Sequence, residues 1–324
     1  MQELSEAARI DAEAAADDAV GFGKRGYEMR RPFWDSSSMS NVAGKTVVVT
    51  GGTAGVGLGA ARSLAQLGAS VVVVSRDETR GREAVQDIVA SSGNSRVQWV
   101  GCDLASLDSV RDAAAQILDL CPRIDALINN AGGMWDERFV SIDGNELTWA
   151  TNVLGPYLLA ELLLPRLIES SPARIIEMTS GGAYSERIDL TDLIGAPEDF
   201  SPKAVYSRTK RAQIIITEER AKQLAGTGVV SHVAHPGWTD SPGLRASQAM
   251  ARFNARFQDE FRSLEQGADT AVWLASADEP LASTGNFWHD RIQRDTHRVA
   301  ETQETSAERQ QLMRVVRERV GLGD

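Results

Sequence analysis

Short apolar runs rich in Val and Ile alternate with longer mixed segments along most of this chain. The runs lie at residues 46–50, 70–75, 97–102, 126–129, 175–179 and 229–234. Continuous apolar runs of this length are typical of strands buried on both faces, as in a parallel sheet. The segments between them are long enough for crossover helices. The pattern predicts an α/β fold, a doubly wound three-layer αβα sandwich with a seven-stranded, mostly parallel sheet.

Residues 45–290 carry this alternation, whereas residues 1–44 differ from it. They combine an Ala- and Glu-rich start, which suits a short helix, with a segment of Gly, basic and aromatic residues. We expect a helical arm packed on the main body, with a membrane-surface or partner-binding role as the alternative. That alternative depends on five side chains, namely Arg25, Arg30, Arg31, Phe33 and Trp34.

Residues 291–324 predict a helical extension. Thr305 and Glu308 have the spacing of a capping box, and Gly321 is a plausible end of the helix. An apolar stripe between them is formed by Leu312, Val316 and Val320. We expect this helix to lie on the main body.

Charge and cysteine content exclude several classes of protein. The 324 residues include 34 Lys and Arg against 45 Asp and Glu, a formal net charge of −11, which argues against a nucleic-acid partner. Cys102 and Cys121 make no disulfide framework, so we expect a reducing, cytoplasmic compartment. No apolar run approaches the roughly 20 residues of a transmembrane helix. The four histidines form no ligand cluster, so we expect no metal.

The first apolar run leads into a glycine-rich turn, T-G-G-T-A-G-V-G (50–57), that should open a helix. Glycines permit a tight turn and close approach of a pyrophosphate to backbone amides, and the helix N-terminus adds a favourable dipole. A place after the first buried strand is the context that such a motif requires. The turn predicts a dinucleotide site with contacts from Gly51, Thr53, Ala54, Gly55, Val56 and Gly57.

This turn has the spacing T-G-x-x-x-G-x-G and resembles that of the short-chain dehydrogenase/reductase family, whose fold is of the Rossmann type. Further matches follow in family order. They are Asp103, N-N-A-G at 129–132, Asn152, Ser180, the Y-x-x-x-K motif from Tyr206 to Lys210, and Pro236-Gly237. Several motifs in family order, at the ends of the expected strands, favour a family relationship over a chance match.

Four stretches are similar to a narrower group, typified by dehydrogenase/reductase family member 12 and close to retinol-dehydrogenase-like members. They are GFGKRGYE (21–28), HPGWTDSPG (235–243), ARFQDEFRSLEQGADTAVWLA (255–275) and FWHDR with TH (287–297). This similarity narrows the subfamily but does not identify the substrate.

The end of the second expected strand should meet the adenosine ribose. Ser75 stands where an Asp would favour NAD, and the guanidinium of Arg76 can pair with a 2′-phosphate. We therefore favour NADP(H). NAD(H) stays open, because a strand that ended two residues later would place the carboxylate of Asp77 on the ribose. The resemblance implies further cofactor contacts at Asp103, Leu104, Asn130, Ala131, Gly132, Tyr206, Lys210, Pro236, Gly237, Thr239 and Ser241.

Tyr206 and Lys210 lie one helical turn apart, so both can face one cleft. A phenol with a pKa of about 10 is a poor base near neutrality, and a nearby ammonium or an oxidised nicotinamide lowers that pKa. The resemblance implies that Tyr206 exchanges the proton with the substrate oxygen, while Lys210 tunes it and binds the nicotinamide ribose. It further implies that Ser180 hydrogen-bonds the substrate oxygen and that Asn152 holds a helix bend and a relay water.

Two features depart from the family pattern. An insert at 181–203 lengthens the segment between Ser180 and Tyr206, and we expect it to lie over the pocket mouth. Ser241 stands where the family often has a Thr that bonds the nicotinamide amide, with Thr239 nearby, and the choice between them stays open.

The resemblance implies an oxidoreductase that transfers hydride between nicotinamide and a carbonyl or alcohol. Met134, Trp135 and Trp238 suggest an apolar or aromatic substrate, unless both Trp residues belong to the core. A non-catalytic NADP-binding regulatory or scaffold protein is the alternative. A serine hydrolase is disfavoured, because Ser180 sits in M-T-S-G-G rather than G-x-S-x-G. A homodimer or homotetramer through the helices that bear Asn152 and Tyr206 stays open, since the terminal segments could cover that surface.

Overall fold

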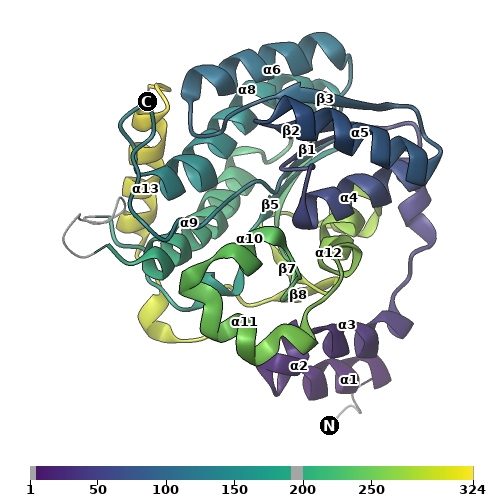
Figure 1. Ribbon diagram of the computed structural model, residues 1–324, viewed down its shortest axis with the longest axis vertical. Coiled ribbons are helices and arrows are strands. Elements are labelled where there is room, and N and C mark those ends of the chain that lie inside the picture. Colours follow the sequence, from purple (N-terminus) through teal and green to yellow (C-terminus); the bar gives the residue numbers. More distant parts are fainter. Residues whose placement is uncertain (1–4, 191–199, 324) are drawn as a thin grey trace.

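The computed structural model describes residues 5–190 and 200–323. Within them an eight-stranded sheet runs through the middle of the molecule in the order β3-β2-β1-β4-β5-β6-β7-β8 (Figure 1). The strands are β1 Thr46–Thr50, β2 Ser70–Ser75, β3 Val97–Gly101, β4 Ala126–Asn129, β5 Ala173–Met178, β6 Val229–His235, β7 Phe287–His289 and β8 Ile292–Arg294. Strands β1 to β7 pair in parallel and only β8 is antiparallel, which confirms the doubly wound sheet.

The prediction of seven strands was wrong by one. Strand β8 has three residues, none fully buried, and it pairs with β7 as a hairpin. The turn consists of Asp290 and Arg291, whose φ angles are 54° and 58°. Hairpin turns with two positive φ angles favour Asn and Gly, so this pair of residues does not signal a turn in the sequence. The strand falls inside the range 291–324 that was expected to be a helical extension.

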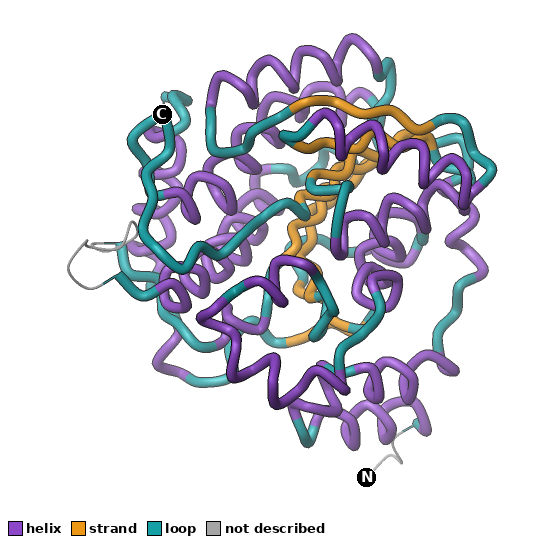
Figure 2. The backbone as a smooth tube through the Cα atoms, in the orientation of Figure 1, coloured by secondary structure: helices purple, strands orange, loops and turns teal. Residues whose placement is uncertain are grey.

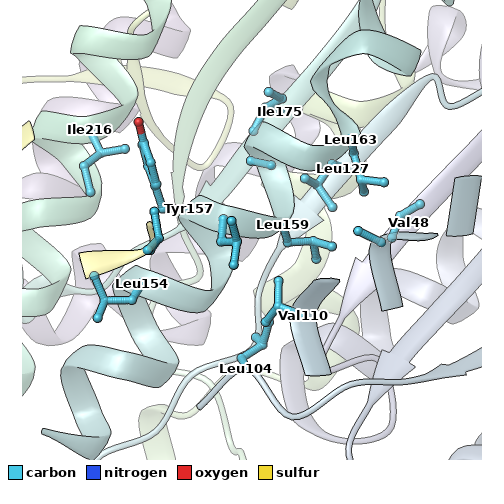
Figure 3. Close-up of a cluster of buried hydrophobic side chains, with 14 of the residues drawn as sticks. Val48, Leu104, Val110, Leu127, Leu154, Tyr157, Leu159, Leu163, Ile175 and Ile216 are labelled. Carbon is cyan, nitrogen blue, oxygen red and sulfur yellow. The ribbon is translucent and has the colours of Figure 1, made fainter. Parts of the chain in front are cut away.

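Helices cover both faces of the sheet (Figure 2), and the side chains of β1 point alternately to the two layers. Val47 and Val49 pack with α4, α5 and α12, whereas Val48 points to the other face. There it joins Leu127 and Leu159 in a cluster under α6, α8 and α9 (Figure 3). The helix bounds are α4 Gly55–Gln66, α5 Glu78–Ser92, α6 Leu107–Leu120, α8 Gly155–Glu169, α9 Pro202–Gln223 and α12 Leu264–Ser276.

The helix that bears Asn152 changes its type along its length. Helix α7 (Leu147–Trp149) passes through a π-helical segment, Ala150–Leu154, into α8. By length and composition the stretch 147–169 could cross a membrane, and 72% of its most apolar window is buried inside the protein. A buried core helix meets the same criterion, so this stretch carries little weight as evidence of a membrane span.

The N-terminal arm contains α1 (Glu6–Ala15), α2 (Asp18–Phe22) and α3 (Lys24–Arg30) and lies near the hairpin edge of the sheet (Figure 1). Arg30 is 3% exposed and donates to Asp11 and Asp290, each at 2.7 Å. The Arg291 guanidinium lies 4.7 Å from the centroid of the Trp34 ring. Two of the five side chains that favoured a membrane or partner role are therefore engaged in packing the arm on the body.

Helix α13 (Ser306–Arg319) is built as its sequence predicts. Thr305 and Glu308 form both hydrogen bonds of the capping box, and Gly321 has a φ of 74°. Its apolar stripe is fully buried against the π-helical segment and α9, in the cluster that contains Leu154 and Tyr157. The stripe consists of Leu312, Val316 and Val320.

Candidate active site

The glycine-rich turn joins β1 to α4 and adopts backbone angles that few other residues accept. Gly51 and Gly55 have φ angles of 68° and 54°. A Cβ on Gly57 would lie 2.3 Å from the Gly51 carbonyl oxygen, so the turn closes only with glycine there. The start of α4 follows with no side-chain cap from Ala54, which leaves its first amide groups for an anion. Thr53 and Val56 are half-buried beside it.

Thr50 ties this turn to the end of β4. Its Oγ1 accepts from the backbone N–H groups of Asn130 and Ala131, each at 3.0 Å. The Asn130 side-chain amide donates to the Thr50 carbonyl at 3.0 Å. Asn129 instead points into the sheet interior, where its amide donates to Glu177 at 2.8 Å. The N-N-A-G segment is thereby fixed beside the glycine turn, as the family resemblance requires.

The residues expected near the adenosine follow β2 and β3. Strand β2 ends at Ser75, whose Oγ accepts from the Trp99 indole at 2.9 Å, and Arg76 is exposed. Asp77 caps α5 by accepting from the Arg80 N–H at 2.9 Å, and this hydrogen bond lowers the pKa of its carboxyl. Asp103 accepts from the Ala105 N–H at 3.0 Å, next to buried Leu104.

Ser180, Tyr206 and Lys210 meet at the carboxyl end of β5. A hydrogen bond links the side chains of Ser180 and Tyr206, and the Lys210 Nζ lies 5.5 Å from the Tyr206 ring centroid. Burial raises the pKa of Tyr206, and the bond from Ser180 opposes that rise. The expectation of a lowered phenol pKa therefore does not hold for the protein alone, since desolvation of the phenolate is the larger effect.

Lys210 is 4% exposed and makes two hydrogen bonds inside the protein. Its Nζ donates to the Met178 carbonyl at 2.9 Å and to Gln213 Oε1 at 3.1 Å. Burial lowers the pKa of Lys210 to about 8, with the charge of Glu177 acting in the opposite direction. The side chain is thus still largely an ammonium at neutral pH, with one N–H left for a group bound in the cleft.

Asn152 lies in the π-helical segment and joins both sides of the site. Its Oδ1 accepts from the Gly133 N–H at 2.8 Å, and its Nδ2 donates to the Gly133 carbonyl and to Thr209 Oγ1, each at 3.0 Å. Its backbone carbonyl accepts from Gln213 Nε2 at 2.9 Å. A single π-helical turn often marks a functional site, because it re-aims side chains and frees carbonyls.

The segment after β6 contains Thr239 and Ser241, the two candidates for the bond to the nicotinamide amide, and the structure places them differently. Thr239 is buried, donates to the Pro236 carbonyl at 3.0 Å and packs on Gly267. Ser241 lies against Gly55 of the glycine turn and caps the short helix α10 (Pro242–Ala246). Gly237 has a φ of 70° and packs on the Arg262 side chain.

The segment after β6 contributes to a cluster of aromatic side chains, here called the lobe. Trp238 packs edge to face with Phe253 and at a tilt with Phe257, at 4.9 and 4.7 Å between ring centroids; both Phe residues lie on α11 (Ala251–Phe257). Trp135 lies over Gly133, and both Trp residues are half-buried. Of the insert 181–203, residues 191–199 lie outside the described residues. Tyr184, in its described part, reaches the Asp295 carbonyl instead of the cleft.

Sequence reasoning missed Gln213 and Glu177. Gln213 is 2% exposed in an otherwise apolar stretch of α9, and Glu177 is 3% exposed on β5. An amide three positions after the Lys of Y-x-x-x-K was the available signal, because residues three apart share a helix face. No group of three metal-ligating side chains occurs among residues 5–190 and 200–323.

Known proteins resemble this chain along most of its length. The family model described as short chain dehydrogenase matches residues 45–252. Dehydrogenase/reductase SDR family member 12 of Bos taurus is 35% identical over 300 residues, covering 92% of this chain and 93% of that protein. Retinol dehydrogenase 12 of Mus musculus is 36% identical over 249 residues, covering 77% and 78%.

A solved structure agrees with the fold. The active-site complex of Pseudomonas aeruginosa RhlG with NADP has a TM-score of 0.64 at 27% sequence identity, covering 78% of this chain and 96% of that one. The parallel sheet, the glycine turn, the Ser180–Tyr206–Lys210 cluster and these similarities together show that the chain belongs to the short-chain dehydrogenase/reductase family of oxidoreductases, in its retinol-dehydrogenase-like group.

Proposed function

We propose that this protein is an NADP(H)-dependent oxidoreductase that transfers hydride between nicotinamide and a carbonyl or alcohol substrate. The observation that carries the proposal is the meeting of Ser180, Tyr206 and Lys210 beside a turn that only glycine can close. The backbone amides at the start of α4 fit a pyrophosphate. A nicotinamide bound there supplies or accepts the hydride.

The protonation states favour carbonyl reduction. Because burial raises the pKa of Tyr206, its phenol stays protonated at neutral pH and can give that proton to a carbonyl oxygen. The Ser180 hydroxyl, bonded to the phenol, can donate to the same oxygen and stabilise its growing charge. The Lys210 ammonium, held by Met178 and Gln213, stabilises the phenolate that the transfer leaves.

Three observations support NADP(H) over NAD(H). Strand β2 ends at Ser75, so no carboxylate ends the strand to meet a ribose. Asp77, the residue that left NAD(H) open, uses its carboxylate to cap α5. Arg76 is exposed beside this turn and can reach a 2′-phosphate, where a guanidinium pairs well. We also assign the nicotinamide amide to Ser241 rather than Thr239, since only Ser241 lies against the glycine turn.

The lobe suggests an apolar or aromatic substrate. Trp238, Phe253 and Phe257 form one contiguous aromatic cluster there. Two relatives, retinol dehydrogenase 12 and polyprenol dehydrogenase of Mus musculus, carry names of apolar alcohols.

Substitution Tyr206→Phe tests the proposal. It removes the proton donor and keeps the ring, so we expect the rate of NADPH-dependent reduction of aromatic aldehydes and ketones to fall at least about 1000-fold, with NADPH affinity unchanged. NADPH absorbance measures turnover, and fluorescence titration measures binding. Equal rates for the variant and the original protein would show that Tyr206 is not the acid. Tight NADPH binding without turnover on any carbonyl would favour the non-catalytic alternative.

Helix α13 bears on the oligomeric state. It buries Leu312, Val316 and Val320 against the segment that bears Asn152, where the resemblance placed a subunit contact. We propose that this helix covers the surface and leaves the protein without a dimer through α8 and α9. Light scattering of the full chain distinguishes a monomer from a dimer or tetramer.

A further inference from the structure

The side chain of Gln213 is one of the two hydrogen-bond acceptors that hold the Lys210 ammonium, the other being the Met178 carbonyl. Gln213 is 2% exposed and lies one turn further along α9. Its Oε1 accepts from the Lys210 Nζ at 3.1 Å, and its Nε2 donates to the Asn152 carbonyl at 2.9 Å. One side chain thereby joins the ammonium to the π-helical segment, in the place where the family resemblance predicts a relay water.

A small internal cavity lies behind this side chain. Its volume is about 10 Å³, close to the space that one water molecule needs. Gln213 lines it, together with Asn152, Tyr157 and Glu177, and Lys210 does not. Val153 and Ile216 complete the lining. The carboxamide therefore separates the ammonium from a cavity that is lined by both polar and apolar side chains and is large enough for one water.

We propose that Gln213 is a positioning residue that replaces the relay water, holding Lys210 in place and closing the path from Lys210 to the cavity. This inference rests on the proposed function, because it assigns Lys210 its role beside Tyr206. A carboxamide neither takes up nor releases a proton near neutrality, so proton transfer from Lys210 stops at Gln213, although the hydrogen bonds continue to Asn152. The proton that Tyr206 gives away is then replaced from the substrate side of the cleft.

Two substitutions separate positioning from packing. Gln213→Leu keeps the volume and the seal but removes the acceptor. Gln213→Ala removes the acceptor and also opens the cavity, so that water can reach the ammonium. If Gln213 only packed, alanine would be the more damaging change, because it leaves a larger void. If it positions Lys210, leucine is the more damaging change.

The control is Thr217→Val. Thr217 is buried on the same face of α9, one turn beyond Gln213, and its hydroxyl has no hydrogen-bond partner among the residues that the structure describes. The variant removes a buried polar atom from this helix without touching Lys210. We expect its kcat and its Lys210 titration to match those of the original protein.

The first measurement needs neither cofactor nor turnover. The pKa of Lys210 is measured by NMR of its ¹³Cε in the cofactor-free protein, with Lys210→Met to assign the signal. We expect a titration near pH 8 in the original protein, a lower pKa in Gln213→Leu and an intermediate value in Gln213→Ala. Identical titrations in all three proteins would overturn the proposal.

The second measurement is the rate of NADPH-dependent reduction of 4-nitrobenzaldehyde. We expect kcat to fall about tenfold in Gln213→Leu and about threefold in Gln213→Ala, with KM little changed. A larger loss in Gln213→Ala than in Gln213→Leu would assign Gln213 to packing and overturn the proposal. No turnover by the original protein on any carbonyl would overturn the proposed function instead, while the NMR titration would still decide the role of Gln213.

Discussion

The nucleotide side and the substrate side of the sheet are held together by different kinds of contact. On the nucleotide side, Thr50 and Asn130 link neighbouring strands through short side chains and backbone groups. On the substrate side, the buried carboxylate of Asp290 accepts from Arg30 of the arm at 2.7 Å and from Arg262 at 2.5 and 2.9 Å. The first arrangement joins two motifs that end neighbouring strands, 80 positions apart, whereas the second joins residues up to 260 positions apart.

The arm also holds the segment that follows β6. The Phe22 carbonyl accepts from the Trp238 N–H at 2.8 Å, and the Gly23 carbonyl accepts from Arg262 Nε at 3.1 Å. A segment expected to meet the nicotinamide therefore depends on the first helices of the chain. The difference teaches that the cofactor turn is a property of its own residues, whereas the substrate lobe is a property of the assembled chain.

Neutralising Asp290 should produce the largest change in stability. Asp290→Asn keeps a residue that tolerates a positive φ, but it leaves the buried guanidinium of Arg262 without its charge partner and takes one of two carboxylates from Arg30. We expect the free energy of unfolding in urea to fall by about 3 kcal/mol, with NADPH affinity unchanged under folding conditions. The control Asp240→Asn breaks an exposed pair with Arg245 and should cost under about 1 kcal/mol. An unchanged midpoint for Asp290→Asn would remove the contrast between the two sides.

Lys210 lies between the two sides of the sheet, and its buried charge affects the free energy of unfolding. Its folded pKa of about 8 lies below the usual 10.5, so the unfolded chain binds more protons between these values and stability rises with pH there. Below pH 8 both states are charged and the full cost of burial remains. Lys210→Met should therefore stabilise the fold by up to about 3 kcal/mol at pH 7, and by less at pH 10, while abolishing activity.

Urea unfolding at the two pH values measures this effect. The control is Lys222→Met, at an exposed position where little change is expected. A Lys210→Met protein that is less stable than the original at pH 7 would show that the hydrogen bonds of Lys210 outweigh the burial of its charge.

A substitution in the glycine turn should weaken cofactor binding and leave the stability of the substrate side unchanged. In Gly57→Ala the new Cβ would meet the Gly51 carbonyl at 2.3 Å, so the turn has to shift away from the pyrophosphate. We expect NADPH to bind at least about 100-fold more weakly, or about 2.7 kcal/mol. Gly243→Ala, with open space around it, is the matched control. Unchanged NADPH affinity in Gly57→Ala would place the dinucleotide elsewhere.

The smallest expected effect is on cofactor choice. Arg76→Ala removes the guanidinium expected at the 2′-phosphate, so NADPH affinity should fall about tenfold while NADH affinity stays the same. Arg82→Ala, on the exposed face of α5 where Arg82 pairs with Glu78, should change neither. Equal losses for both cofactors would mean that Arg76 does not select the phosphate.

The regular part of the fold was predictable because its signals are local. Strand β1 ends where its apolar run ends, and the glycine turn follows directly. Strand β8 was missed, since the turn before it uses Asp290 and Arg291 at positive φ angles. Those angles are held by ion pairs with Arg262 and Asp269, which no local pattern reveals.

In the active site, too, local signals were predictable and long-range contacts were not. The family resemblance pointed to Tyr206 and Lys210, and helical spacing predicted that both face the same way. Sequence reasoning left Ser241 and Thr239 in competition, and it could not find Gln213, whose partners lie on two different elements.

The sequence by itself determined the layered sheet and the cofactor turn, which follow from hydrophobic period and glycine geometry. The reactive side chains came from the resemblance of its motifs to a known family. Only the tertiary structure decided how the arm supports the substrate lobe, which hydroxyl lies beside the turn, and what charge Tyr206 and Lys210 carry. Burial and charge partners determine a pKa, and both come from residues brought together only when the chain is folded.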